Sequence, residues 1–143
     1  MRPRDELAAL IPHQGAMCLN ERVLAWDADR VRLATATHRA ADNPLRRDGR
    51  LRALHLCEYG AQAMAVHGGL CARAAGGRAA PGYLVSLRAV ELHCDHVEEL
   101  PGELEVEAER LAASPESWQY AFEVRHDGRV LARGRAAVMA RTA

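Results

Sequence analysis

The sequence contains no lysine, so all 19 of its Lys/Arg positions are arginine. Without a lysine amine, Schiff-base chemistry and a lysine general base are excluded. The formal net charge is zero, so no overall field draws the chain to nucleic acid or to an anionic membrane, and we expect neither as a partner. The N-terminal residues are charged where a secretory signal needs an apolar core, and we therefore expect a cytoplasmic protein.

The chain also lacks any Cys-x-x-Cys spacing. Its four cysteines lie far apart, which argues against a disulfide framework or a zinc ribbon and favours reduced thiols: Cys18, Cys57, Cys71 and Cys94. The segment His93-Cys94-Asp95-His96 offers metal-binding side chains. On a strand, however, its two histidines point to opposite faces, so we expect no metal site.

Only one long apolar run is present, from Ala53 to Ala75. Its length approaches that of a membrane span, but it carries several polar or charged side chains: His55, Glu58, Gln62, His67 and Arg73. It is also built on alanine and glycine rather than leucine. A buried helix of a water-soluble domain is therefore the better prediction.

Elsewhere, apolar and polar residues alternate with the period of a β-strand. We predict strands over residues 17–26, 31–37, 83–97, 103–109, 118–124 and 130–138. Pro101-Gly102 and Asp127-Gly128 are turn signals, and the second predicts a tight hairpin. Strands grouped around one long helix predict an α+β fold in which a curved antiparallel sheet wraps that helix, within one domain over residues 1–143.

Glu58 is the most informative residue for chemistry, because it is the only acidic residue between Gly49 and Val90. A carboxylate among apolar neighbours is costly to bury in ionised form. Desolvation would favour the protonated carboxyl, which can donate a proton near neutral pH. The alternative is a polar residue on an exposed helix stripe.

A connection rich in arginine, residues 43–52, precedes the apolar run. Its guanidinium groups are suited to bind an acidic carrier protein or the phosphate of a pantetheine arm. The alternative is a solvated loop without a partner.

Two segments together resemble 3-hydroxyacyl-ACP dehydratases. Ile11-Pro12-His13, followed by Glu21-Arg22-Val23, resembles the opening of that family, and Glu58-Tyr59-Gly60-Ala61-Gln62-Ala63 resembles the start of its central helix. The resemblance implies the hotdog fold. It is closest to the divergent dehydratase subunits of aryl-polyene clusters, in which Asn-Pro, a basic loop and Glu-Tyr-x-Ala-Gln-Ala-Met-Ala follow in this order.

The resemblance assigns the catalytic carboxylate to Glu58 and the amide that steadies it to Gln62. Residues four apart share one helix face, which allows this contact. The backbone N–H groups of Ala53 and Leu54 are expected to polarise the substrate thioester. In the family a histidine about fourteen residues earlier takes the α-proton, but here Asn43-Pro44 occupies that position, and we expect Asn43 to contact substrate instead.

Two other histidines are candidates for the missing base. His13 lies in the segment that approaches the mouth of the site in the family, and His55 is three residues before Glu58, close enough on a helix to bind it. His67 is more than two turns away from Glu58. A structural role for such helix histidines is the alternative.

The resemblance leaves three hypotheses for function. The first is a 3-hydroxyacyl-ACP dehydratase of fatty-acid or polyene biosynthesis, needing no cofactor beyond the phosphopantetheine that carries its substrate. The second is a non-catalytic or half-site subunit of a dehydratase heterodimer, and the third is an acyl-thioester hydrolase. Acyl carrier protein and a second subunit, identical or different, are the expected partners, and the strand over Tyr83–Val97 is the expected dimer edge.

Overall fold

A computed structural model describes residues 3–11, 15–77 and 82–140 of the chain. Two α-helices, three short 3-10 helices and six strands follow in this order: α1 (Pro3–Ala8), η1 (Gly15–Met17), β1 (Arg22–Trp26), β2 (Arg30–Thr35), η2 (Thr37–Arg39), η3 (Ala53–His55), α2 (Leu56–Ala74), β3 (Gly82–Leu92), β4 (Leu104–Ala113), β5 (Ser117–His126) and β6 (Arg129–Ala140).

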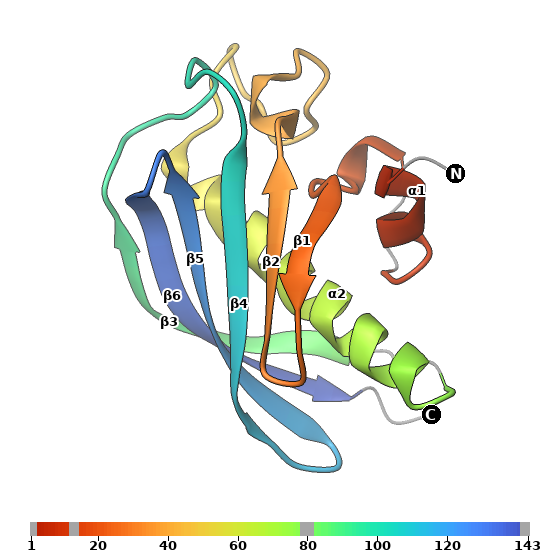
Figure 1. Ribbon diagram of the computed structural model, residues 1–143. Helices are drawn as coiled ribbons and strands as arrows, with labels where there is room; N and C mark the ends of the chain where they lie inside the picture. The colour runs from red at the N-terminus through yellow and green to blue at the C-terminus, as the bar shows by residue number, and fades with distance from the viewer. Residues whose placement is uncertain (1–2, 12–14, 78–81, 141–143) are drawn as a thin grey trace.

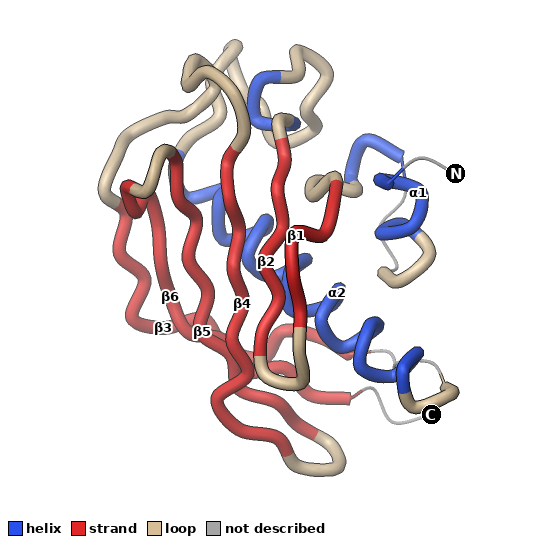
Figure 2. The backbone as a smooth tube through the Cα atoms, in the orientation of Figure 1, coloured by secondary structure: helices blue, strands red, loops and turns tan. Residues whose placement is uncertain are grey.

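The strands form one antiparallel sheet in the order β1-β2-β4-β5-β6-β3. The sheet curves around α2, which lies in its concave side (Figures 1 and 2). The predicted α+β arrangement is thereby confirmed. The predicted hairpin is also present, with Asp127 and Gly128 both at positive φ (50° and 79°), as a tight turn between β5 and β6 requires.

The core lies between α2 and the inner face of the sheet. Alternate residues of the central strands are buried there, and α2 contributes Leu56, Tyr59, Ala63, Met64 and Val66. Helix and sheet approach closely at Gly60, where an added Cβ atom would lie 2.5 Å from the Phe122 ring. Glycine is therefore required at position 60 by lack of space.

The outer face of the sheet carries the glutamates of β4, which the alternation predicted to face water. Arginines of the neighbouring strand bind them, with Arg30–Glu109 at 2.6 Å and Arg32–Glu105 at 2.7 Å. These cross-strand pairs are exposed and contribute little individually. Because these charged residues lie on the outer face, the concave side is the apolar side of the sheet.

Two predicted strand boundaries are wrong by five residues. The first strand begins at Arg22 rather than at residue 17, and β3 ends at Leu92 rather than at residue 97. Residues beyond the end of β3 turn instead toward the segment before α2, with Val97 N–H donating to Leu51 O and Ala53 N–H donating to Asp95 O, both at 2.9 Å. This connection fixes where α2 begins.

Unlike every central strand, β3 buries no side chain on either face. It is the last strand of the sheet and pairs only with β6 among the described strands. Its exposed apolar side chains are Tyr83, Leu84, Val85, Leu87 and Leu92. An apolar edge of this length is unusual for a chain that remains alone in water.

Candidate active site at the start of α2

Glu58 lies in the first turn of α2 and is exposed, although Tyr59 and Gln62 close to it are buried. Of the two interpretations of Glu58, the exposed helix stripe is the one that the single chain shows. Within the described residues, no hydrogen bond or ion pair reaches its carboxylate. The helix stripe that carries Glu58 faces away from the sheet, and Ala61 and Ala65 continue it half-buried.

Two hollows of the described surface lie away from Glu58. One, of about 410 Å³, lies on the outer face of the sheet and is lined by Ala25, Trp26, Asp27, Arg30, Arg32, Glu107 and Arg125. The other, of about 350 Å³, lies between α1, β1 and the end of α2 and is lined by Glu6, Leu7, Leu10, Arg22, Val23, Leu70 and Arg73. Glu58 lines neither of these two hollows.

Gln62 makes different contacts from those expected. Its amide is buried, its Oε1 accepts the Leu19 N–H at 2.9 Å, and its Nε2 donates to Met17 O at 2.6 Å. Both ends of the side chain thus hold the segment before β1 against the helix. The expected role of steadying Glu58 is not what these contacts provide.

Asn43 is buried where the resemblance predicted a contact with substrate. Its Nδ2 donates to Thr37 O at 2.9 Å and to the Tyr59 hydroxyl at 3.0 Å, while its Oδ1 accepts the Leu45 N–H at 2.8 Å. Its polar atoms are therefore engaged inside the protein. An amide also has no basic nitrogen, so Asn43 cannot take the place of a histidine base.

Tyr59 is a functional candidate that sequence reasoning missed. Its side chain is fully buried, and its hydroxyl lies 2.8 Å from Thr37 Oγ1 as well as 3.0 Å from Asn43. Its carbonyl accepts from Asn20 Nδ2 at 3.2 Å. The residue next to Glu58 is thus anchored at both its backbone and its side chain. Its place beside Glu58 was the only signal available in the sequence.

The structure describes only one of the two candidate bases. His13 lies outside the described residues. His55 is half-buried immediately before α2, and among the described contacts none joins its ring to Glu58. Neither assignment is tested by the single chain, and both stay predictions.

Of the two backbone N–H groups expected to bind the thioester, one is already used inside the protein. Ala53 N–H donates to Asp95 O at 2.9 Å and is not free to bind a thioester. Within the described part of the chain, no backbone acceptor binds the Leu54 N–H, and the Leu54 side chain is 59% exposed. Leu54 is therefore the donor that remains available at the start of α2.

The arginine-rich connection divides into two parts. Arg46 and Arg47 donate to backbone carbonyls, and neither binds a carboxylate among the described residues. Arg50 contacts the His96 ring, and Arg52 lies 3.6 Å from Asp95. The connection is thus tied to the loop after β3 on one side and carries unneutralised guanidinium groups on the other.

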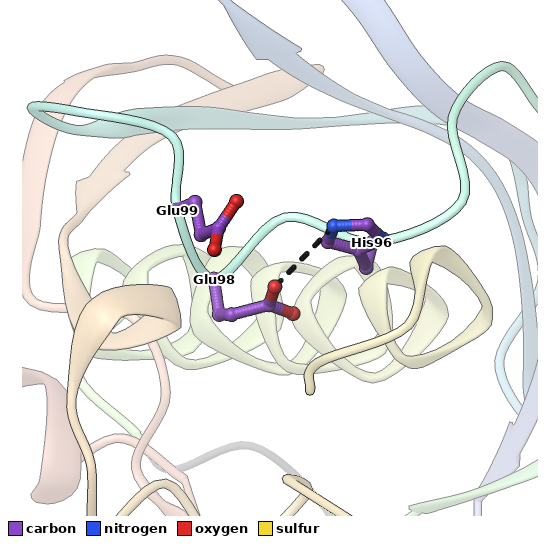
Figure 3. A group of neighbouring side chains, drawn as sticks. All are labelled: His96, Glu98 and Glu99. Carbon is purple, nitrogen blue, oxygen red and sulfur yellow. Dashed lines mark ion pairs between the residues drawn. The ribbon is translucent and has the colours of Figure 1, made fainter. Parts of the chain in front are cut away.

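A cluster of His96, Glu98 and Glu99 places one potential metal ligand from each residue within 4.8 Å of the others (Figure 3). Glu98 and His96 point toward one another, but Glu98 Oε1 also accepts the Leu51 N–H at 2.7 Å. The guanidinium of Arg50 lies against the same imidazole. These contacts explain the cluster as a clamp between the β3–β4 connection and the segment before α2.

Two fully buried histidines make the stability of the fold depend on pH. Burial lowers the pKa of His38 and of His67, although each ring binds a backbone carbonyl, Leu100 O at 2.9 Å and Asp27 O at 2.9 Å, respectively. Each histidine is therefore held neutral in the folded chain. Among the described residues, none binds Nδ1 of His38, whereas Nδ1 of His67 lies 2.7 Å from the Tyr120 hydroxyl.

We expect the melting temperature to stay level above pH of about 6.5, the ordinary histidine pKa, and to fall below it. The reason is that the unfolded chain takes up protons at each histidine before the folded chain does. Thermal unfolding between acidic and neutral pH measures this. His67→Gln should reduce the pH dependence, whereas a melting temperature that does not change on acidification would contradict the assignment.

The sheet, its single enclosed helix and the placement of Glu58 define the hotdog-fold class. A family model described as ApeP-like, ApeP dehydratase, matches residues 5–142. The chain therefore belongs to the ApeP-like dehydratase family.

No described helix combines the length and apolarity needed to cross a bilayer.

Solved structures agree with this fold. The chain is similar to one in the dehydratase heterocomplex ApeI:P from Xenorhabdus doucetiae, with a TM-score of 0.85 and 22% identity over 99% of this chain and 93% of that chain. It is also similar to a thioesterase family protein from Silicibacter pomeroyi, with a TM-score of 0.65 and 21% identity over 98% and 96% of the two chains. A comparison with curated protein sequences gives no match.

Proposed function

We propose that this chain is one subunit of a two-subunit dehydratase that removes water from 3-hydroxyacyl thioesters. Glu58 supplies the proton to the departing hydroxyl group, and the second subunit supplies the base. The observation that carries the proposal is that Glu58 lies open to solvent at the start of α2, while the position expected for a histidine holds the engaged Asn43.

The reaction follows from these assignments. The partner's base removes the α-proton, the freed electron pair forms the α,β double bond, and the β-hydroxyl leaves as water with the proton from Glu58. Leu54 N–H is placed to bind the thioester oxygen as negative charge develops on it. The proton held by the base then returns to the Glu58 carboxylate, which closes the cycle.

A different subunit, rather than a second copy, supports this chemistry better. A homodimer would bring two copies of Asn43 to the site. The exposed apolar strand β3 provides an edge on which another subunit can continue the sheet. The similarity to a chain from a dehydratase heterocomplex supports the same arrangement.

The substrate would arrive on the phosphopantetheine arm of an acyl carrier protein, as a step of fatty-acid or polyene biosynthesis. Acyl carrier proteins are acidic, and Arg46 and Arg47 of the connection before α2 have no carboxylate partner among the described residues. Charge complementarity of this kind guides association. Coenzyme A thioesters are the competing form of substrate.

Thioester hydrolysis is the second candidate function, because an exposed carboxylate without a histidine can direct a water molecule to the carbonyl. The two activities leave different products. Dehydration keeps the acyl group on its carrier and removes one water, whereas hydrolysis releases a free thiol.

The test is reconstitution with a cognate dehydratase subunit from the same genome. We expect the purified complex to convert 3-hydroxyacyl-ACP to trans-2-enoyl-ACP, and this chain alone to be slower by about 10² or more, because it lacks the base. Mass spectrometry of the carrier protein and a thiol assay follow the two products. A fully active homodimer would contradict the two-subunit proposal, and thiol release without dehydration would favour the hydrolase.

A further inference from the structure

The first turn of α2 is held by a buried hydrogen-bond network that no catalytic step above requires. Tyr59 OH lies 2.8 Å from Thr37 Oγ1 and 3.0 Å from Asn43 Nδ2, and Asn43 also donates to Thr37 O. All three residues are buried, with relative exposures of 0%, 7% and 6%. The network thus joins α2 to η2 and to the arginine-rich connection.

A second set of bonds extends the network to the segment before β1. Thr37 Oγ1 donates to Leu19 O at 2.6 Å, and Asn20 Nδ2 donates to the carbonyl of Tyr59 at 3.2 Å. The Tyr59 hydroxyl therefore has fixed partners, and Asn20 binds the Tyr59 backbone as well. A helix turn restrained in this way has little freedom to rotate about its axis.

We infer that Tyr59, Thr37 and Asn43 form a positioning device that sets the direction in which Glu58 leaves α2. The inference rests on the proposed function, since its purpose is to aim the Glu58 carboxyl at a base carried by another subunit. Because that base belongs to another chain, the distance and direction between acid and base depend on how rigidly each subunit holds its own group. A displacement of about 1 Å in such a pair costs about 10²-fold in rate.

Asn43 is the residue that makes this device possible. Its amide gives two hydrogens and accepts a third hydrogen bond, from the Leu45 N–H at 2.8 Å. An imidazole cannot provide the same three contacts, because it has two nitrogen atoms on a rigid ring. In this inference Asn43 holds the first turn of α2 in place and does not transfer a proton.

Tyr59→Phe tests the inference, because it removes the hydroxyl and keeps the ring. In the reconstituted complex we expect kcat to fall about 10- to 100-fold with KM within about twofold. Thr37→Val, which removes another member of the network, should act in the same direction. Both variants should still bind the partner subunit.

Tyr120→Phe is the matched control. Tyr120 is also buried, and its hydroxyl lies 2.7 Å from Nδ1 of His67, a residue farther along α2. We expect Tyr120→Phe to lower the melting temperature about as much as Tyr59→Phe does, without changing kcat. Equal kcat values in the two variants would overturn the inference, because they would reduce Tyr59 to an ordinary buried tyrosine.

Hydrogen exchange of the isolated chain separates this inference from the proposed function. Tyr59→Phe should accelerate amide exchange in residues 53–60 at least tenfold, and Tyr120→Phe should not. If the wild-type complex dehydrates no 3-hydroxyacyl thioester, the proposed function fails, and exchange alone then decides whether the first turn is held by this network. Unchanged exchange in Tyr59→Phe would overturn it.

Discussion

Replacing Leu87 by glutamate is expected to prevent assembly of the chain with its partner subunit and to abolish the activity of the complex. Leu87 lies in β3, the apolar sheet edge, and is 40% exposed in the single chain. A charge enclosed at an interface without a partner costs about 3 to 5 kcal/mol, which weakens binding on the order of 100-fold or more. Size-exclusion chromatography and binding titrations measure this effect.

The fold of the single chain should tolerate the same substitution, because the side chain of Leu87 is not in the core. Leu24→Glu is the matched control, since Leu24 is also 40% exposed but lies in β1 at the other edge of the sheet. We expect Leu24→Glu to leave assembly intact. Equal binding by the Leu87→Glu and Leu24→Glu variants would contradict the assignment of β3 as the interface.

The fold could be predicted because several local signals agreed. The alternation in residues 103–109 and 118–124 predicts strands with one buried face, and Asp127-Gly128 predicts the turn that closes the last hairpin. The long apolar run could be interpreted as a buried helix because its polar residues exclude a bilayer. Consistency between neighbouring segments then left few other arrangements.

The strand boundaries could not be predicted because side chains from distant positions decide them. The segment before β1 carries a strand-like pattern, but Gln62 binds the backbone of Met17 and Leu19 and withdraws it from the sheet. In the same way, Glu98 binds the Leu51 N–H and helps to turn the chain after β3. Such contacts span more than 40 residues and leave no periodic trace in the sequence.

The site was predicted in part. The sequence identified Glu58, but its apolar neighbours suggested that the helix packs on every side, whereas the small residues Ala61 and Ala65 lie with Glu58 on the stripe that the sheet does not cover. The sequence alone does not show whether an alanine-rich helix face is covered by its own chain or by another chain. The role of Asn43 as a structural anchor was also invisible, because it depends on Tyr59 and Thr37.

Replacing Glu58 by glutamine is expected to reduce dehydration of 3-hydroxyacyl-ACP by the complex about 10²- to 10⁴-fold, the contribution of a general acid. Glutamine is nearly the same size as glutamate and can donate a hydrogen bond, but it cannot give up a proton to the departing hydroxyl. Because Glu58 is exposed in the single chain, folding should be unaffected. Binding of the partner subunit and of acyl carrier protein should be retained.

Glu116→Gln is the matched control for this substitution. Glu116 is also an exposed carboxylate, but it lies in the β4–β5 turn, which Figure 1 places at the other end of the sheet from the first turn of α2. We expect Glu116→Gln to keep the wild-type rate. A comparison of the two variants removes any effect of losing one negative charge from the surface.

The most direct measurement is the single-turnover rate of dehydration by complexes in which only this chain carries the substitution. The account predicts that Glu58→Gln forms a normal complex with a rate near background and that Glu116→Gln matches the wild type. A Glu58→Gln complex that forms fully and dehydrates its substrate at the wild-type rate would contradict the assignment of the acid to this chain.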